Sequence, residues 1–284
     1  MNVFLACALL AAAPQEPPVF RAEVGLVRVE VLVTVKGSPL RGLRTADFEI
    51  RDNGRVQELE PLLAEESPVD TALVLDMSGS VRGAKMDALK EAARAFLDGL
   101  RGDEQAALVA FREEVLLIEP FTADRARVQG ALARTPARGS TALCDAVYAA
   151  LRLREPGSRR TAVVVFSDGV DNMSWLAPSE VVEAASRSEA IVYGVAAHGQ
   201  GDPKETFLRD VVRATGGQLF EIAGEHDLRA RFLDVLAAIR SRYVLSYAPQ
   251  GGDTAGWHTL AVRLRRVKGD VLARPGYWRY ATDR

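Results

Sequence analysis

The sequence is poor in cysteine, with only Cys7 and Cys144 among 284 residues. Cys7 lies in an N-terminal apolar run that has the features of a cleavable leader, so a processed chain would keep Cys144 alone. One cysteine cannot form an internal disulfide, even in an oxidising compartment. Stability must therefore come from packing, and 48% hydrophobic residues allow a core for one domain of about 200 residues and a smaller unit.

The sequence also lacks a dominant charge. Its 36 Lys and Arg residues face 38 Asp and Glu residues, which gives a formal net charge of -2. Nucleic-acid binding depends on clustered Lys and Arg that neutralise phosphates, so we expect no nucleic-acid partner. One short basic run is predicted to form the outward face of a strand: Arg263, Arg265, Arg266 and Lys268.

No apolar run is long enough to cross a bilayer. Residues 3–13 form an apolar run with the length of a signal-peptide core, and it ends in small residues before Pro14. No basic residue precedes this run, which leaves a buried N-terminal strand or a wrongly assigned start codon as alternatives. We predict a signal peptide at residues 1–13, no integral membrane segment after its removal, and export to the periplasm, the cell surface or the medium.

Both ends of the remaining chain have the pattern of antiparallel strands. Between residues 24 and 35, valines alternate with other residues, a period of two that is typical of a half-buried strand. Asn53-Gly54 separates apolar segments at residues 48–50 and 56–59, and this dipeptide tolerates the positive φ angles of a tight hairpin turn. Further strands are predicted at residues 243–247, 258–264 and 270–273. We expect residues 20–66 and 241–284 to pair into one small β module.

The middle of the chain, residues 68–240, alternates short apolar strands with amphipathic helices, as in a parallel sheet that helices cover on both faces. The predicted strands are residues 72–75, 106–111, 115–118, 162–166, 191–195 and 218–221. The predicted helices are residues 85–100, 124–133, 142–153, 178–188, 205–214 and 227–239. The predicted fold class is therefore α/β, with a doubly wound, mostly parallel, Rossmann-like sheet and a small β module formed by the N- and C-terminal segments.

Three loops carry side-chain oxygens. Asp76, Ser78 and Ser80 follow the first strand in a D-x-S-x-S pattern. Thr141 opens a helix, and Asp168 follows the most apolar strand. The D-x-S-x-S pattern alone is weak evidence, because Ser and Asp also cap helices. In a doubly wound sheet of order 3-2-1-4-5-6, however, the strands before Asp76 and Asp168 are neighbours at the topological switch point, so we expect the five side chains to converge there.

Such a set offers only hard oxygen donors, and two of its members are carboxylates. Mg²⁺ prefers oxygen ligands and retains water, whereas Zn²⁺ seeks nitrogen or sulfur, so the set favours Mg²⁺, with Mn²⁺ or Ca²⁺ as alternatives. The two carboxylates neutralise the ion and the hydroxyls add no charge, so an open position would still attract a carboxylate from elsewhere. The cluster therefore predicts a cation that holds a protein partner presenting an acidic residue.

The three loops together resemble the metal-ion-dependent adhesion site of von Willebrand factor type A domains, as in integrin inserted domains. The resemblance covers residues 68–240 and implies a binding module and not an enzyme. In the family, Ser and Thr hydroxyls hold the ion directly, Asp often holds it through water, and an acidic residue of the partner completes the shell. On this resemblance the metal residues are Asp76, Ser78, Ser80, Thr141 and Asp168, with Asp171 in the accompanying D-G-x-x-D pattern.

The flanks add a second resemblance, to exported bacterial proteins of the VWFA-related family described from acidobacteria. It is carried by the stretch from Gly42 to Gly54 (GLRTADFEIRDNG) and by the stretch from Arg274 to Trp278 (RPGYW). This likeness extends over nearly the whole chain. It implies an architecture more than a biochemical role.

Two other functions fit parts of the same residues. A serine hydrolase could use Ser78 and Asp168 with His198 or His226. The G-x-S-x-G turn of such enzymes, however, has glycine two residues before and after the nucleophile, where this chain has Asp76 and Ser80. A structural scaffold could instead keep a vestigial metal site and bind through its β module, and titration with Mg²⁺ would separate that case from the metal-dependent one.

Three further residues near these loops have more than one interpretation. Cys144 is predicted to be a core residue and not a nucleophile or soft metal ligand, because cysteine is among the most buried residue types. Met173 and Trp175, which follow Asp171, could form an apolar rim for a partner or pack on the adjacent helix. The exposure of these two side chains decides between the alternatives.

Overall fold

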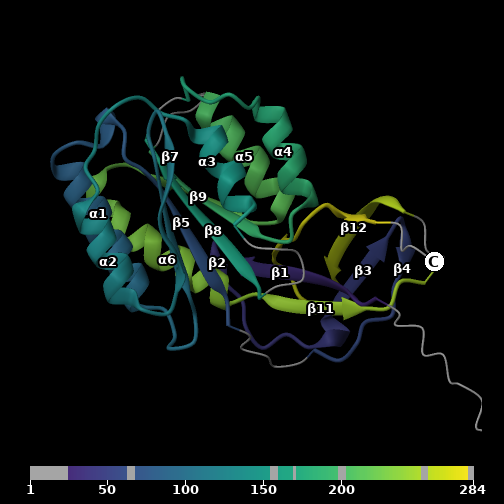
Figure 1. Cartoon of the computed structure of the whole chain (residues 1–284). Helices are drawn as coiled ribbons and strands as arrows, with labels where there is room; N and C mark the ends of the chain where they lie inside the picture. Colours follow the sequence, from purple (N-terminus) through teal and green to yellow (C-terminus); the bar gives the residue numbers. More distant parts are fainter. Residues whose placement is uncertain are drawn as a thin grey trace, which may run out of the picture.

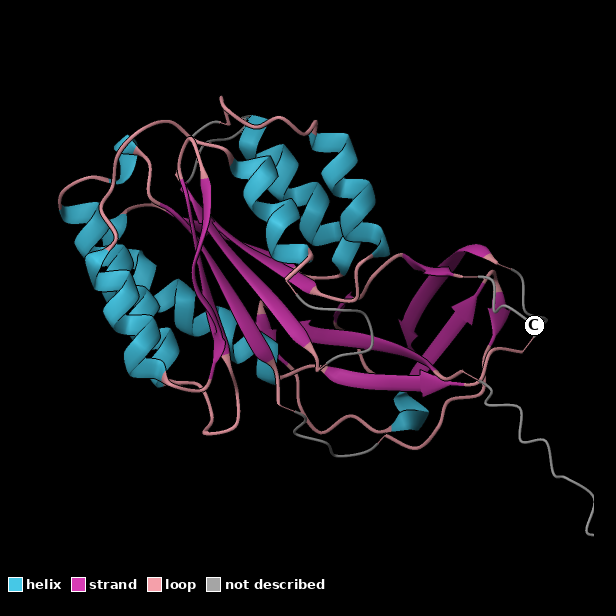
Figure 2. Cartoon of the chain, in the orientation of Figure 1, coloured by secondary structure: helices cyan, strands magenta, loops and turns pink. Residues whose placement is uncertain are grey.

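The structure is a computed structural model that describes residues 25–62, 68–153, 159–168, 171–197, 203–250 and 255–280. The predicted signal peptide at residues 1–13 and the candidate His198 lie outside these residues. A mostly parallel central sheet lies between two layers of helices, and smaller antiparallel sheets adjoin it (Figures 1 and 2). This architecture confirms the predicted α/β fold class.

The central sheet has the strand order β10-β9-β8-β5-β6-β7. Read from β7 and numbered along the chain within this sheet, the order is 3-2-1-4-5-6, as predicted. Strand β7 is antiparallel to β6, and the other neighbours are parallel. The strands are β5 (Asp70–Asp76), β6 (Ala106–Phe111), β7 (Val115–Thr122), β8 (Thr161–Ser167), β9 (Ile191–Ala197) and β10 (Gln218–Ile222).

Helices cover both faces of this sheet (Figure 1). One layer contains α1 (Ala84–Asp98), α2 (Arg125–Arg134) and α6 (Leu228–Arg240), and the other contains α3 (Leu143–Leu151), α4 (Pro178–Arg187) and α5 (Pro203–Thr215). Strand β5 is buried along its whole length because alternate residues pack on opposite layers, Leu73 on the first and Val74 on the second. Within the described ranges no helix combines the length and apolar character needed to cross a membrane.

The β module consists of two antiparallel sheets, β11-β1-β13 with the short β2 on β1, and β14-β12-β3-β4. Both sheets combine strands from the two ends of the chain. Val29 and Leu245 from the first sheet, and Ile50 and Leu260 from the second, enter one shared apolar core. The strands are β1 (Val27–Val35), β2 (Ser38–Pro39), β3 (Phe48–Asp52), β4 (Arg55–Val56), β11 (Tyr243–Tyr247), β12 (Gly256–Leu264), β13 (Asp270–Leu272) and β14 (Gly276–Arg279).

Some details of the module differ from the prediction. The hairpin turn is confirmed, since Asn53 and Gly54 have φ values of 46° and 81°. Its second strand, however, ends at Val56 instead of Leu59, because the chain crosses to the other sheet and the Glu60 amide donates to the Ser246 carbonyl (2.8 Å). The prediction also missed β14, and it placed the whole basic run in a strand that ends at Leu264, so only Arg263 of the run belongs to it.

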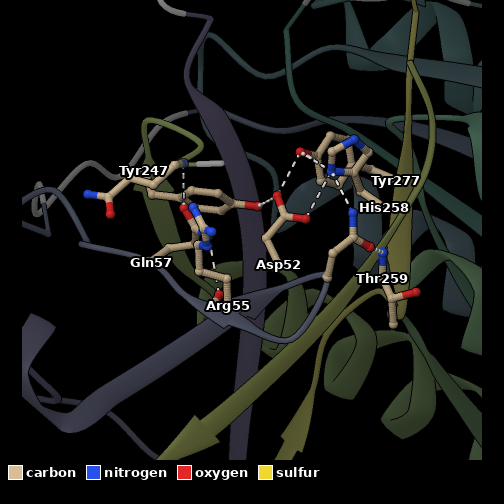
Figure 3. Close-up of polar contacts among 9 residues, drawn as sticks. Asp52, Arg55, Gln57, Tyr247, His258, Thr259 and Tyr277 are labelled. Atoms are coloured by element: carbon tan, nitrogen blue, oxygen red, sulfur yellow. Dashed lines mark hydrogen bonds and ion pairs between the residues drawn. The ribbon is translucent and has the colours of Figure 1, made fainter. Parts of the chain in front are cut away.

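A largely buried polar cluster lies within the module (Figure 3). The carboxylate of Asp52 accepts hydrogen bonds from the hydroxyls of Tyr247 (2.8 Å) and Tyr277 (2.9 Å), and it pairs with Nδ1 of His258 (2.9 Å). Each of the four side chains comes from a different strand, β3, β11, β12 or β14. The cluster therefore joins both sheets of the module.

Arginines connect the module to the central domain. The Arg160 guanidinium, just before β8, donates two hydrogen bonds to the Glu30 carboxylate in β1, at 2.8 and 2.6 Å. Arg242 donates to the hydroxyl of Tyr193 in β9 (2.6 Å) and to the Gly216 carbonyl (2.6 Å). Two-pronged guanidinium contacts of this kind fix orientation as well as adding binding energy. The module is thus held at a defined position on the domain.

Candidate metal site

The first site loop begins at Asp76, the last residue of β5, whose side chain is buried. The Ser78 amide donates to its Oδ1 (2.9 Å), and the Ser167 hydroxyl donates to its Oδ2 (2.8 Å). Burial raises the pKa of the Asp76 carboxyl above its ordinary value; these hydrogen bonds act in the opposite direction, and the nearby charge of Asp168 adds to the increase. A negative charge here is therefore costly without a cation.

A row of hydrogen bonds joins the first loop to the loop after β8. The Ser78 and Ser80 hydroxyls lie 2.9 Å apart, and the Ser80 hydroxyl donates to Oδ1 of Asp168 (2.8 Å). The Asp168 side chain is only 2% exposed. Four of the five predicted residues, Asp76, Ser78, Ser80 and Asp168, are thus brought together at the carboxyl ends of β5 and β8, which are neighbours in the sheet.

The fifth residue, Thr141, is buried, and its backbone is bonded to the loop that follows Asp171. Its amide donates to Oδ1 of Asn172 (3.0 Å), and its carbonyl accepts from the amides of Asn172 (3.0 Å) and Met173 (3.2 Å). Among the described contacts, none joins the Thr141 hydroxyl directly to the other four side chains. The position of Thr141 therefore depends on the loops around it.

Backbone hydrogen bonds hold the Thr141 loop against the D-x-S-x-S loop. The Gly79 amide donates to the Gly139 carbonyl (2.9 Å), and the Arg138 amide donates to the Met77 carbonyl (2.8 Å). Gly139 has a φ of +81°, and a Cβ atom there would lie 1.5 Å from Oε2 of Glu113. The positive φ favours glycine at position 139, and at Gly79 a Cβ atom would lie 3.3 Å from the Gly139 carbonyl oxygen, so the absence of a side chain at Gly79 helps the two loops to approach closely.

Asp171 serves the neighbouring helix and not the row itself. Its Oδ2 accepts from the Cys144 amide in the first turn of α3 (2.7 Å), and its Oδ1 accepts from the Ser174 amide (3.0 Å). Burial acts to raise the pKa of the Asp171 carboxyl, but the amide and side-chain hydrogen bonds from Cys144 and Ser174 outweigh it and keep the pKa below its ordinary value. A carboxylate at a helix N-terminus is favourable in this way.

Sequence reasoning missed Lys85, the second residue of α1. Its ammonium forms an ion pair with Oδ2 of Asp168, and the Lys85 side chain is 34% exposed. A cation in the first turn of a helix faces the positive end of the helix dipole and is normally unfavourable. This unfavourable position is the signal in the sequence that could have identified Lys85. The ion pair with Asp168 compensates for the repulsion from the helix dipole.

A groove of about 380 Å³ opens beside this ion pair. Besides Lys85 and Asp168 it is lined by the segment after β10, residues 222–226, which includes Glu225 and His226. The groove brings solvent and ligands up to the Lys85–Asp168 pair, in which Lys85 is the more exposed partner. It is a place where a cation could enter the row.

The alternative roles can be compared with these contacts. In the part of the chain that the structure describes, the Ser78 hydroxyl pairs with Ser80, and the His226 ring, 79% exposed, pairs with Asp227 (3.5 Å), so no Ser–His pair is described. Cys144 lies in the core that α3, α4 and α5 form with the sheet, and burial raises the pKa of its thiol. A buried, protonated thiol is a poor nucleophile and a poor metal ligand.

The residues present fit a hard cation with few charged ligands. Two carboxylates and several hydroxyls are gathered at one edge of the sheet, and the ammonium of Lys85 already lies against one of the carboxylates. Within the described residues there is no group of three or more His, Cys, Asp or Glu side chains that could hold a metal ion. Any ion held here would therefore depend on the Ser and Thr oxygens as well as on Asp76 and Asp168.

Comparison with known proteins identifies the central domain. Residues 71–170 match the family model described as von Willebrand factor type A domain. Inter-alpha-trypsin inhibitor heavy chain H4 of Sus scrofa is 25% identical over 214 residues, which are 71% of this chain and 22% of that protein. The chain thus spans less than a quarter of the length of this relative.

Two solved structures have a similar fold. A von Willebrand factor type A structure from Catenulispora acidiphila is 16% identical, has a TM-score of 0.56, and covers 87% of this chain and 76% of its own. Proximal thread matrix protein 1 of the mussel byssus, with a zinc-occupied MIDAS motif, is 18% identical, has a TM-score of 0.55, and covers 65% of this chain and 48% of its own. Residues 71–170 thus match the von Willebrand factor type A domain, and these solved structures show that the chain shares its fold.

Proposed function

We propose that the chain is a protein-binding module of an exported protein, and that a divalent cation, held by Asp76, Ser78, Ser80, Thr141 and Asp168, is completed by a carboxylate of the partner. The cation, most suitably Mg²⁺, would supply positive charge to the partner's acidic residue. The chain's own residues hold and orient it. We also propose that residues 68–240 form the binding domain, with residues 20–66 and 241–284 as its supporting β module.

The observation that carries this proposal is the row from Ser78 through Ser80 to Asp168, with Lys85 on its last carboxylate. A row of oxygens that pairs with an ammonium is already selective for positive charge. Hydroxyls contribute ligands without adding negative charge, so an ion balanced by two carboxylates would keep its attraction for a third. A catalytic serine would instead require a base, and the described contacts of Ser78 supply none.

The comparisons add support of a more general kind. The family of the matched domain often binds proteins and often holds a metal ion, and the similar mussel protein has zinc in its MIDAS motif. Zinc in a relative makes the choice of ion an experimental question, although an all-oxygen donor set favours Mg²⁺, Mn²⁺ or Ca²⁺. Export is supported by the apolar run at residues 3–13.

The direct test is calorimetric titration of the full chain with Mg²⁺, Mn²⁺, Ca²⁺ and Zn²⁺ after treatment with chelator. We expect saturable 1:1 binding by the wild type and a large loss of affinity in Asp168→Asn, because this variant keeps the shape of the side chain but removes one of two neutralising charges. Asp87→Asn is the matched control, since Asp87 is exposed in the first turn of α1, close to the site. Its affinity should stay near that of the wild type.

The partner side of the proposal has its own test. Thr141→Ala removes one hydroxyl from a site otherwise left intact, and we expect it to abolish cation-dependent partner binding while the melting temperature changes little. Absence of saturable heat with all four ions would favour the alternative scaffold that binds through its β module. Equal affinities of wild type and Asp168→Asn would show that the ion binds elsewhere.

A further inference from the structure

Trp175 is the most exposed large hydrophobic side chain of the described residues, at 95%, and Met173 beside it is 46% exposed. If these side chains packed on the adjacent helix, as one interpretation of the sequence had it, they would be largely buried, and neither is. Single exposed apolar residues are common on protein surfaces and need no explanation. The loop that carries these two residues, however, differs from an ordinary surface loop.

The loop is fixed by two half-buried carboxylates, that of Asp145 in α3 and that of Asp171 at its own start. Both oxygens of Asp145, in the first turn of α3, accept backbone amides, from Trp175 (3.0 Å) and from Leu176 (3.0 Å). Asp171 holds the Ser174 amide, and the Ser174 hydroxyl accepts from the Asp145 amide (3.1 Å). The backbone on both sides of Trp175 is therefore bonded while its ring is left in solvent. Because the backbone that carries the ring is already fixed, its ordering adds little to the entropy lost when a partner covers Trp175.

The same loop is continuous with the proposed cation site. The amides of Asn172 and Met173 donate to the carbonyl of Thr141, and Asn172 accepts the Thr141 amide in return. Met173 ends this bonded segment, and only Ser174 separates it from Trp175, whose amide is also bonded. On α3, Tyr148 lies one turn beyond Asp145, on the same side of the helix, and is 39% exposed. An apolar rim of Met173, Trp175 and Tyr148 therefore adjoins the Thr141 loop.

We infer that this rim is the specificity surface of the binding site: it packs against an apolar side chain that lies next to the acidic residue in a peptide segment of the partner. The inference rests on the proposed function, because the cation fixes the acidic residue and so determines which side chain reaches the rim. A cation and a carboxylate recognise any exposed Asp or Glu. The rim would restrict recognition to acidic residues flanked by an aromatic or large aliphatic residue, and tryptophan is enriched at such energetic centres of interfaces.

The test uses an array of synthetic Gly-Ser peptides that each carry one Glu, with every amino acid placed in turn at the two positions before and after it. The purified full chain is applied with Mg²⁺ and, in parallel, with chelator. We expect Mg²⁺-dependent binding to rise roughly tenfold when Phe, Trp or Leu replaces Gly at one flanking position. Trp175→Ala should remove this preference but keep Mg²⁺ affinity and the weaker binding of the plain Glu peptide. Tyr280→Ala, which truncates another exposed aromatic side chain in the β module, is the matched control and should keep the preference.

The outcomes separate the two proposals. If Trp175→Ala keeps the flanking preference while binding still requires Mg²⁺, the rim is not the specificity surface and the cation site stands. If peptides bind equally well in chelator, or if none binds, both proposals fail for peptide partners. If the wild type forms Mg²⁺-dependent dimers in sedimentation experiments and Trp175→Ala is monomeric, the rim covers a second copy of this chain, which overturns the peptide assignment.

Discussion

Replacing Asp52 by alanine tests how the two ends of the chain are held together. The Asp52 carboxylate lies at the end of β3 with its side chain 5% exposed, and it is the shared acceptor for Tyr247, Tyr277 and His258 (Figure 3). All three partners are distant in the sequence: Tyr247 is 195 positions away, His258 is 206 and Tyr277 is 225. Removal of the carboxylate leaves the three partners without their common acceptor inside a closed core.

The size of the effect follows from two opposing contributions. A hydrogen bond to a charged group contributes about 1.5–3 kcal/mol, whereas removing a buried carboxylate also relieves its own desolvation. A buried donor left without its acceptor costs about 1–3 kcal/mol, and for three such partners, less the desolvation relieved, we expect Asp52→Ala to cost about 3–5 kcal/mol. Domains are stable by only about 5–15 kcal/mol, so the module should be largely unfolded under mildly denaturing conditions.

The assay is urea denaturation combined with hydrogen exchange of the β12 and β14 amides. Asp270→Ala, which removes an exposed carboxylate from β13, is the matched control and should change stability by less than about 0.5 kcal/mol. Tyr277→Phe should cost about 1–2 kcal/mol in the wild type and less in the Asp52→Ala background, because the hydroxyl has then already lost its bond to the carboxylate and keeps only the longer contact with Nδ1 of His258 (3.3 Å). A cost below about 1 kcal/mol for Asp52→Ala, or equal costs of Tyr277→Phe in both backgrounds, would refute the view that the cluster joins the sheets.

Three further predictions concern single features. Lys85→Met should tighten Mg²⁺ binding roughly tenfold in calorimetric titration, since it removes a positive charge that competes for the site and charges about 4 Å apart in water interact by about 1 kcal/mol for each unit pair; unchanged or weaker binding contradicts the competition. Burial and the hydrogen bond to Asp52 raise the pKa of Tyr277 to about 12, and they raise that of Tyr247 as well. Because both folded pKa values lie above the unfolded value of about 10, the stabilisation is complete below that pH and is lost as the pH rises through the folded values, so ultraviolet titration should show these two ionising late and together with unfolding. Gly216→Ala should lower the free energy of unfolding by at least about 2 kcal/mol, since its φ is +74° and a Cβ atom would lie 2.3 Å from the backbone nitrogen at position 274, whereas Gly37→Ala, with a φ of +79° in open space, should lose only about 1 kcal/mol. Equal losses for the two variants, measured by urea denaturation, would show that the contact at position 274 relaxes without cost.

The fold class could be predicted from the sequence because its main signals are local. Apolar runs such as residues 162–166 and the helical patterns between them fix the alternation of strand and helix, and right-handed crossovers leave few possible sheet orders. The neighbouring positions of β5 and β8, and hence of Asp76 and Asp168, followed from this order. The metal ligation of these residues stays a prediction.

The remaining features depend on contacts between distant parts of the chain, which no local pattern reports. Asp52 precedes Asn53-Gly54 and has the sequence context of a solvated turn residue, yet its carboxylate is buried because three donors converge on it. Lys85 has the context of an exposed helical residue, yet it pairs with a carboxylate 83 positions later. The exposure of Trp175 could not be deduced either, since it depends on Asp145, in a helix formed 30 positions earlier.

The buried polar cluster also has a consequence for how the β module chooses its strand pairing. Alternation of apolar residues selects the inner face of β3 and β12, but a shift of their register by two residues would keep the same faces inside. In the observed register Leu260 lies opposite Asp52, and His258 comes close enough to bond the carboxylate. A two-residue shift would move the ring by about 7 Å, well beyond hydrogen-bonding distance, and deprive a buried carboxylate of one of its partners. The apolar core therefore drives the two ends of the chain together, and the cost of losing this buried contact to Asp52 favours the observed register.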